Sequence, residues 1–116
     1  MNKRRKGTAM EELAARYLVR EGCELLERQY RSRFGEIDLI LREGEELVFA
    51  EVKSRTSLAY GTPAEAVDAH KRARLRLTAE AYCEQHGIAD VPMRFDVVEI
   101  LEQNGKRFIR VLRNAF

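Results

Sequence analysis

The sequence lacks the features that mark a membrane protein, a disulfide-stabilised protein or a disordered chain. No apolar run approaches the length of a membrane span, and residues 47–50 are followed at once by Glu51. Cys23 and Cys83 are far apart, and neither has a second cysteine or a histidine at zinc-ligand spacing. We therefore expect two reduced thiols in a globular chain, since 45% of the residues are hydrophobic and 34% are charged.

Targeting segments, internal repeats and low-complexity tracts are also missing. The sequence begins with a basic run at 3–6, but no apolar signal-peptide core follows it, so we expect a cytoplasmic protein with no membrane partner. The length of 116 residues predicts one domain. We divide the chain into a basic N-terminal tail, residues 1–7, and a single domain, residues 8–116.

The charge of the chain is small in sum but uneven along the sequence. The net charge is +2, made up of +4 over residues 1–33, −5 over 34–69 and +3 over 70–116. Such variation also arises without function in any chain of this length. An acidic centre between basic flanks nevertheless favours a metal-dependent enzyme that acts on a polyanion, because carboxylates hold the cation and basic residues hold the phosphates.

Hydrophobic periodicity and turn residues predict one helix, three strands, a long helix and two strands. Thr8 to Glu11 matches a capping box and predicts the first helix start, with the helix ending at Gly22. The second helix is predicted from Thr62-Pro63 to about His86. The strands are predicted at 24–30, 36–42, 46–54, 93–101 and 106–112. This order predicts an α/β fold with helices packed on a mixed sheet.

Two carboxylates and one lysine occupy neighbouring predicted strands. Because alternate strand residues share a face, Glu51 and Lys53 point the same way, and a hairpin turn at 43–45 would bring Asp38 towards them. Such a set suits Mg²⁺ and a water molecule aimed at a phosphate. The alternative is a salt bridge of Lys53 with either acid on a solvated face of the sheet. The spacing alone does not decide between the two interpretations.

These segments resemble a known family. Asp38, a gap of twelve residues and then Glu51-Val52-Lys53 resembles the PD-(D/E)xK pattern of restriction-endonuclease-like nucleases. GEIDLI, EVKSR, GTPAEAVDAHKR and RFDVVEI more closely resemble the YraN-like family, small bacterial predicted endonucleases similar in outline to archaeal Holliday-junction resolvases. The resemblance runs from about Gly7 to Ile100. It implies a restriction-endonuclease-like α/β fold with a central mixed five-stranded sheet flanked by helices.

The resemblance also implies roles for individual residues. Asp38 and Glu51 would bind Mg²⁺ or Mn²⁺, with the backbone carbonyl of Val52 as a further ligand. Lys53 would orient or help to deprotonate the attacking water. We expect the nearby acids to keep Lys53 protonated, so that it acts first as an electrostatic clamp.

Two further acids have competing interpretations. Glu11 stands where the family has a glutamate in the first helix and would complete the acidic site, although Met10 replaces the usual glycine before it. As the last residue of the capping box, Glu11 could equally bond back to the amide of Thr8. Glu36 shares a face with Asp38 and is either a supporting acid or a solvated strand-end residue.

Basic residues near the acidic set are candidates for contacts with nucleic acid. We expect this role for residues beside the two central strands and on the long helix, off its stripe of alternating charges: Arg31, Arg33, Arg55, Lys71 and Arg74. The leading hypothesis is a metal-dependent DNA endonuclease, with branched structures and repair intermediates as candidate substrates. The alternative is a nucleic-acid-binding module without catalysis. A homodimer would supply the two active sites that cutting both strands requires.

Overall fold

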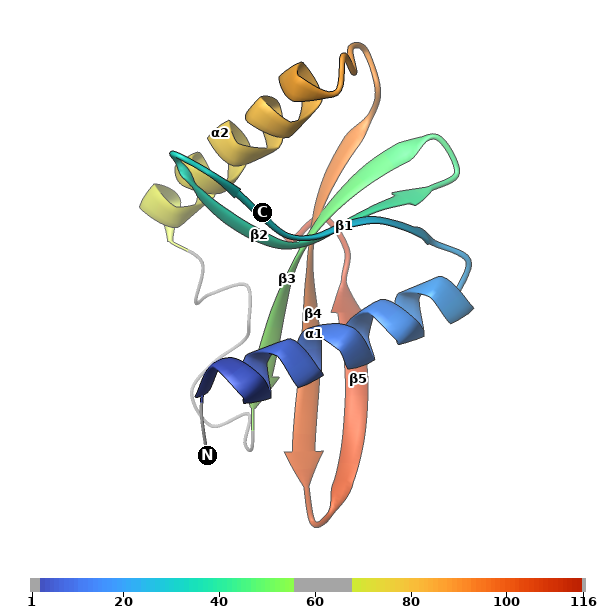
Figure 1. The fold of residues 1–116 in the computed structure, drawn as a ribbon. Coiled ribbons are helices and arrows are strands. Elements are labelled where there is room, and N and C mark those ends of the chain that lie inside the picture. Colours follow the sequence, from blue (N-terminus) through green and yellow to red (C-terminus); the bar gives the residue numbers. More distant parts are fainter. Residues whose placement is uncertain (1–2, 56–67, 116) are drawn as a thin grey trace.

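A computed structural model of the chain describes residues 3–55 and 68–115. The elements follow the predicted order: α1 (Lys3–Arg20), β1 (Glu24–Ser32), β2 (Gly35–Glu43), β3 (Glu46–Arg55), α2 (Ala69–Gln85), β4 (Met93–Gln103) and β5 (Lys106–Leu112). The five strands form one sheet in the order β1-β2-β3-β4-β5 (Figure 1). Only the β3–β4 pairing is parallel among the described strands, so the sheet is mixed.

Each helix covers one face of the sheet and has its own hydrophobic core. The α1 core contains Ala14 and Leu18 together with Leu39, Ala50 and Ile100 from the sheet. The α2 core lies on the other face and joins Leu75, Ala79 and Tyr82 to sheet residues that include Ile40 and Phe49 (Figure 1). The predicted five-stranded mixed sheet flanked by helices is therefore confirmed. The arrangement is compatible with a restriction-endonuclease-like fold. Among the described residues, no helix is both long and apolar enough to cross a membrane.

The first helix begins earlier than its sequence signal predicts. Helix α1 starts at Lys3, so Thr8 lies inside the helix and the predicted start at Thr8 is wrong. Lysine and arginine are good helix formers, and the single Gly7 costs only about 1 kcal/mol in a helix interior. Glu11 consequently does not occupy the third position of a capping box, and its side chain is available for other contacts.

The long helix begins at Ala69 in the part of the chain that the structure describes. Asp68 has an extended backbone and caps this helix by accepting a hydrogen bond from the Lys71 N–H at 2.8 Å. The start predicted at Thr62-Pro63 lies outside the described residues. This cap fixes the first turn of α2, and with it the position from which Lys71 reaches the sheet.

Candidate active site

The β2–β3 hairpin places Asp38 and Glu51 where its two strands stop pairing. The registered pairs run from Glu43–Glu46 to Leu39–Ala50. Directly beyond that last pair, Asp38 Oδ2 accepts a hydrogen bond from the Val52 N–H at 2.8 Å. The Asp38 side chain thus replaces a backbone carbonyl as the hydrogen-bond acceptor for the Val52 amide. This hydrogen bond also fixes the Asp38 carboxylate beside β3. The predicted approach of Asp38 to the Glu51–Lys53 segment is confirmed.

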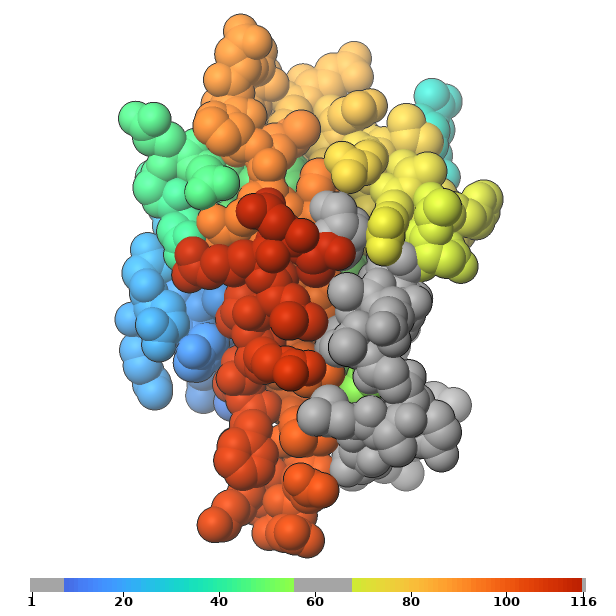
Figure 2. Space-filling view, turned by 180° about the vertical axis from the view of Figure 1, so that it is seen from behind, coloured from blue at the N-terminus to red at the C-terminus, as the bar shows by residue number. Residues whose placement is uncertain are grey.

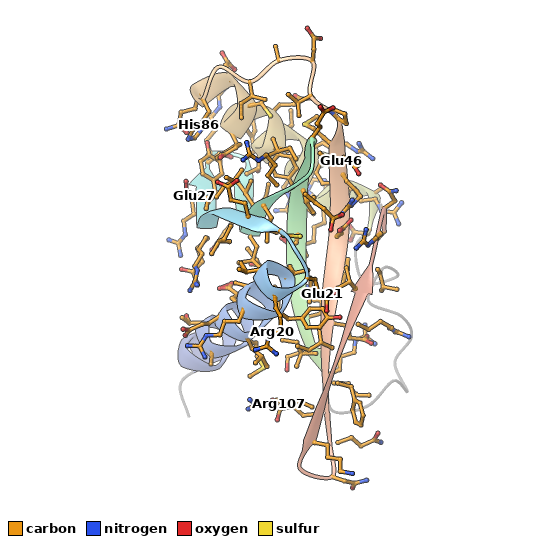
Figure 3. The ribbon with its side chains drawn as sticks, turned by 90° about the vertical axis from the view of Figure 1, so that its right-hand side faces the viewer. Arg20, Glu21, Glu27, Glu46, His86 and Arg107 are labelled. Carbon is orange, nitrogen blue, oxygen red and sulfur yellow. The ribbon has the colours of Figure 1, made fainter. Side chains whose placement is uncertain are left out.

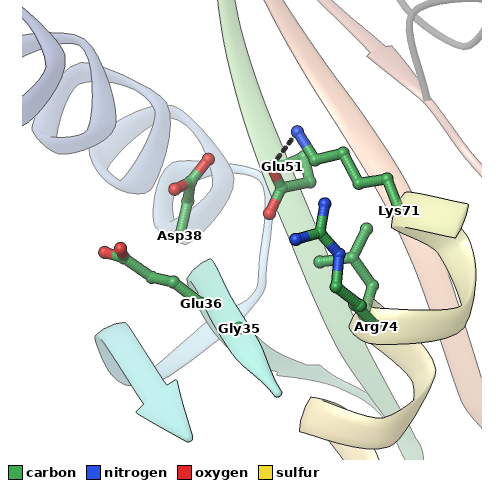
Figure 4. Close-up of a pocket in the computed structure, with 7 residues that line it drawn as sticks. Gly35, Glu36, Asp38, Glu51, Lys71 and Arg74 are labelled. Carbon is green, nitrogen blue, oxygen red and sulfur yellow. Dashed lines mark ion pairs between the residues drawn. The ribbon is translucent and has the colours of Figure 1, made fainter. Parts of the chain in front are cut away.

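A pocket of about 270 Å³ opens beside this junction. Asp38 and Glu51 point into it from the sheet, while Lys71 and Arg74 reach it from the first turns of α2 (Figure 4). Gly35, Glu36 and Leu75 complete its lining. The pocket therefore combines acids from adjacent strands with bases from a helix that follows later in the chain.

Glu51 is held in an unusual state for a carboxylate. It is only 6% exposed. Its Oε2 lies 3.6 Å from Lys71 Nζ, and its buried Oε1 has no hydrogen-bond partner among the described residues. Burial and then the nearby Asp38 raise the pKa of Glu51 to about 7, against the opposing effects of Lys71 and Lys53. A divalent cation with oxygen ligands would stabilise the ionised form and supply the missing partner of Oε1.

The sequence left open a salt bridge of Lys53 with Asp38 or Glu51, and the structure has such an ion pair with a different lysine. In the described structure Glu51 pairs with Lys71 rather than with Lys53. Burial, followed by the nearby Lys71, lowers the pKa of Lys53, and the attraction of Glu51 and Asp38 opposes that shift only in part. Sequence reasoning considered the acids alone and did not foresee the effects of burial and of Lys71 on the pKa of Lys53. That Lys53 stays protonated remains a prediction.

Glu11 reaches the same region from α1. Its Oε2 accepts a hydrogen bond from Gln29 Nε2 at 2.8 Å. Burial raises the pKa of Glu11, and Asp38 adds to the increase after the opposing effect of Gln29. Gln29 lies opposite Asp38 on the neighbouring strand β1, between the pairs Arg28–Leu39 and Tyr30–Ile37. Its backbone φ of 47° is in the left-handed region. Glu11 thus lies near enough to Asp38 for the two acids to repel each other.

The predicted nucleic-acid contacts divide into two groups. Lys71 and Arg74 line the pocket. The other three have protein partners: Arg31 pairs with Glu36 at 3.5 Å, the Arg33 guanidinium lies over the Phe34 ring at 4.8 Å, and Arg55 Nε lies 3.7 Å from Glu99 Oε2. These contacts are made within the protein and do not test whether the three arginines bind nucleic acid, so that role stays a prediction.

Sequence reasoning missed Glu99. The parallel register aligns Glu99 of β4 with Lys53 of β3, and Arg110 of β5 pairs with Glu99 from the other side. Glu99 is 2% exposed and lies 2.8 Å from Arg110 Nη2. The sequence did contain a signal for this residue. Glu99 alternates with Val97 and Leu101 along the strand, so an acid occupies a position where an apolar side chain is expected.

The donor set is compatible with magnesium. The described residues contain no group of three or more His, Cys, Asp or Glu side chains arranged to hold a metal ion. Magnesium usually keeps several waters and takes only one or two carboxylates from the protein. Asp38, Glu51 and the Val52 carbonyl, all oxygen donors, would therefore be a sufficient protein contribution.

The fold and the site together define a class: a small mixed α/β protein with paired carboxylates and lysines at a junction between central strands. Residues 10–100 match the model of the uncharacterised protein family UPF0102. The chain is 48% identical over 111 residues to a UPF0102 protein of Rhodococcus opacus, covering 95% of this chain and 94% of the relative. It is 43% identical over 118 residues to one of Moorella thermoacetica, covering 100% of this chain and 98% of the relative.

The chain therefore belongs to the uncharacterised family UPF0102. This confirms the YraN-like resemblance that its motifs predict. Membership of the nuclease superfamily and similarity to archaeal resolvases stay predictions, because the matched family and these relatives carry no described activity.

Proposed function

We propose that this protein is a metal-dependent nuclease that hydrolyses phosphodiester bonds in DNA. The observation that carries the proposal is the buried Glu51 oxygen without a partner, next to Asp38 and beside two lysines. Two mutually repelling carboxylates in a pocket are unfavourable unless a cation or a proton compensates them. The surrounding bases suit a polyanionic substrate.

Each residue of the pocket has a role that follows from its position. Asp38 and Glu51, with the Val52 carbonyl, would hold Mg²⁺ or Mn²⁺. When bound, the cation would neutralise charge on the phosphate and acidify a water molecule. Lys53 would orient that water and, because its pKa is lowered, accept its proton more readily than an exposed lysine would. Lys71 and Arg74 would bind phosphate oxygens from the opposite wall of the pocket.

The activity is tested on labelled duplex, single-stranded and four-way-junction DNA with Mg²⁺, Mn²⁺ or EDTA. We expect metal-dependent cleavage of at least one substrate. Asp38→Asn, Glu51→Gln and Lys53→Met should each reduce its rate by about 100-fold or more. Glu45→Gln is the matched control, because it removes an exposed carboxylate at the far end of the same hairpin. Circular dichroism checks that every variant is folded.

Two results would contradict the proposal. One is the absence of cleavage on all three substrates in either metal. The other is a rate that survives Asp38→Asn and Lys53→Met unchanged, which would assign the cleavage to a contaminant or another site.

A second candidate is a nucleic-acid-binding module without catalysis. The contact of Lys71 Nζ with Glu51 Oε2 favours it, because a lysine already supplies a positive charge to that carboxylate. Isothermal titration with Mn²⁺ separates the two candidates. A binding module shows no metal affinity that depends on Asp38 and Glu51, whereas the nuclease shows one that Asp38→Asn weakens.

A further inference from the structure

The free edge of the sheet carries a second polar surface. The antiparallel register pairs Arg110 with Glu99, Phe108 with Leu101 and Lys106 with Gln103. Ile109 and Val111, the alternate residues of β5, pack against the α1 core. Lys106, Phe108 and Arg110, here called the β5 strip, therefore project from the face opposite to α1.

The β5 strip lies on the same face of the sheet as the acidic site. Register pairs connect Lys53 to Glu99 and Glu99 to Arg110 across three strands. In Figure 2, which views the side opposite to α1, β5 (red) stands at the surface of the molecule. The strip and the Glu51–Lys53 region thus lie on the same side of the sheet.

The strip combines an exposed aromatic ring with exposed positive charge. Phe108 is 54% exposed, more than any other large hydrophobic residue that the structure describes. The Arg110 side chain is 49% exposed, although its guanidinium lies 2.8 Å from Glu99 Oε1. An arginine has five N–H donors, so this pair leaves several of them for a ligand.

Buried Glu99 orients the cations of this surface. Its two oxygens face Arg110 at 2.8 Å and Arg55 at 3.7 Å, from strands on either side of β4. A carboxylate that is only 2% exposed needs polar partners of this kind. The Arg55 side chain is consequently held beside Glu99 of β4, and Arg55 lies two positions beyond Lys53 along β3.

The charge of β5 indicates what the strip binds. The strand contains three basic residues and no acid. A second copy of this chain would bring like charges together at the edge, and charged edge strands oppose strand-to-strand association. Phosphates match the cations, and an unpaired base matches an exposed ring, because base–aromatic stacking does not depend on base identity.

We propose that the β5 strip, together with Arg55, binds a single-stranded segment of nucleic acid that leads into the Asp38–Glu51 site. The phosphates contact Arg110, Arg55 and Lys106, and one base stacks on Phe108. This assignment rests on the proposed function for its class of substrate. It adds that the substrate has an unpaired region, which lies over the β5 edge.

The test is fluorescence anisotropy with a labelled single-stranded oligonucleotide and a duplex of equal length, both in EDTA to prevent cleavage. We expect Phe108→Ala to weaken binding of the single strand roughly tenfold and to change duplex binding little. Arg110→Ala should weaken binding and lower the slope of log affinity against log salt by about one. Phe108→Ala is at an exposed position and should keep the fold, whereas Arg110→Ala also removes a charge partner of buried Glu99. Circular dichroism and urea denaturation therefore check that each variant is folded.

Arg107→Ala is the matched control. Arg107 lies on the same strand and is 53% exposed in its side chain, but it faces the α1 side of the sheet and pairs with Glu102 (Figure 3). We expect it to leave the salt slope unchanged. Glu102→Gln is likewise the control for Glu99→Gln, which should weaken single-strand binding by releasing Arg55 and Arg110.

Several outcomes would overturn the inference. They are the absence of single-strand binding by the unmodified chain, unchanged affinity in the Phe108→Ala and Arg110→Ala variants, and an equal effect of Arg107→Ala. A dimer in light scattering that Phe108→Ala dissociates would instead assign the strip to contacts between copies. Strip-dependent binding without any cleavage would reject only the nuclease activity, whereas cleavage with strip-independent binding would reject only this inference.

Discussion

Glu51 combines deep burial with a partner for only one of its two oxygens. A carboxylate in such a place is more stable protonated than ionised until the pH exceeds its raised pKa. At neutral pH the site is therefore poised between the two protonation states, and the folded protein is sensitive to anything that supplies positive charge there. Lys71 provides part of that charge from α2.

The raised pKa of Glu51 predicts a pH-dependent stability. Between the ordinary value of 4.5 and the folded value of about 7, the folded state binds more protons than the unfolded state, so the free energy of unfolding falls as the pH rises. Above pH 7 the full penalty is about 3 kcal/mol. Glu51→Gln should therefore be more stabilising at pH 8 than at pH 5, by about 2–3 kcal/mol.

Urea denaturation in EDTA at the two pH values measures this difference. Glu45→Gln, at an exposed position, should show none. A Glu51→Gln effect that does not change with pH would contradict the assigned ionisation state.

At the scale of elements, a second buried ion network joins the β2–β3 turn to β4. Arg94 is 6% exposed and contacts Asp96 at 3.0 Å and both Glu43 and Glu46 at 3.1 Å. Asp96 and then Glu43 raise the pKa of Arg94 despite its burial, so the arginine stays charged. Asp96 also accepts a hydrogen bond from the Asn114 N–H, which attaches the end of the chain to β4.

Removing this cation should strongly destabilise the sheet. Arg94→Met leaves Asp96 buried without its charge partner, and breaking a buried pair in this way costs about 3–5 kcal/mol. Arg16→Met, which removes an exposed helix pair with Glu12, should cost less than about 0.5 kcal/mol. Urea denaturation compares the two variants. A loss below about 1 kcal/mol for Arg94→Met would show that the network is not needed for stability.

The elements were predictable where their signals are local. Strand alternation and the turns at 43–45 and Asn104-Gly105 predict both hairpins, and they predict the approach of Asp38 to Glu51. Contacts between distant segments were not predictable. Lys71 meets Glu51 through the docking of α2, and Glu99 meets Lys53 through a parallel register that no hairpin turn sets. The helix start was missed because a capping motif is a weak signal against the helix-forming residues before it.

At the scale of the whole molecule, the proposed site links metal binding to global stability. A ligand that binds only the folded state at a hundredfold excess over its dissociation constant stabilises that state by about 2.7 kcal/mol. Mn²⁺ or Mg²⁺ should therefore raise the melting temperature, and EDTA should reverse the increase. Asp38→Asn should lose the effect, whereas Glu45→Gln should keep it. An equal increase in both variants, measured by scanning calorimetry, would place the cation elsewhere.

The strand order of the sheet has a consequence for how the protein folds. The order in space equals the order in the chain, so every pairing except β3–β4 is a local hairpin. Parallel pairing of β3 with β4 must close a long loop that includes α2, and such long-range closure is slow compared with hairpin formation. The two halves of the polar face arise in separate hairpins, one with Asp38 and Glu51 and the other with Glu99 and Arg110. We therefore expect the complete surface to form only in the last, slowest stage of folding.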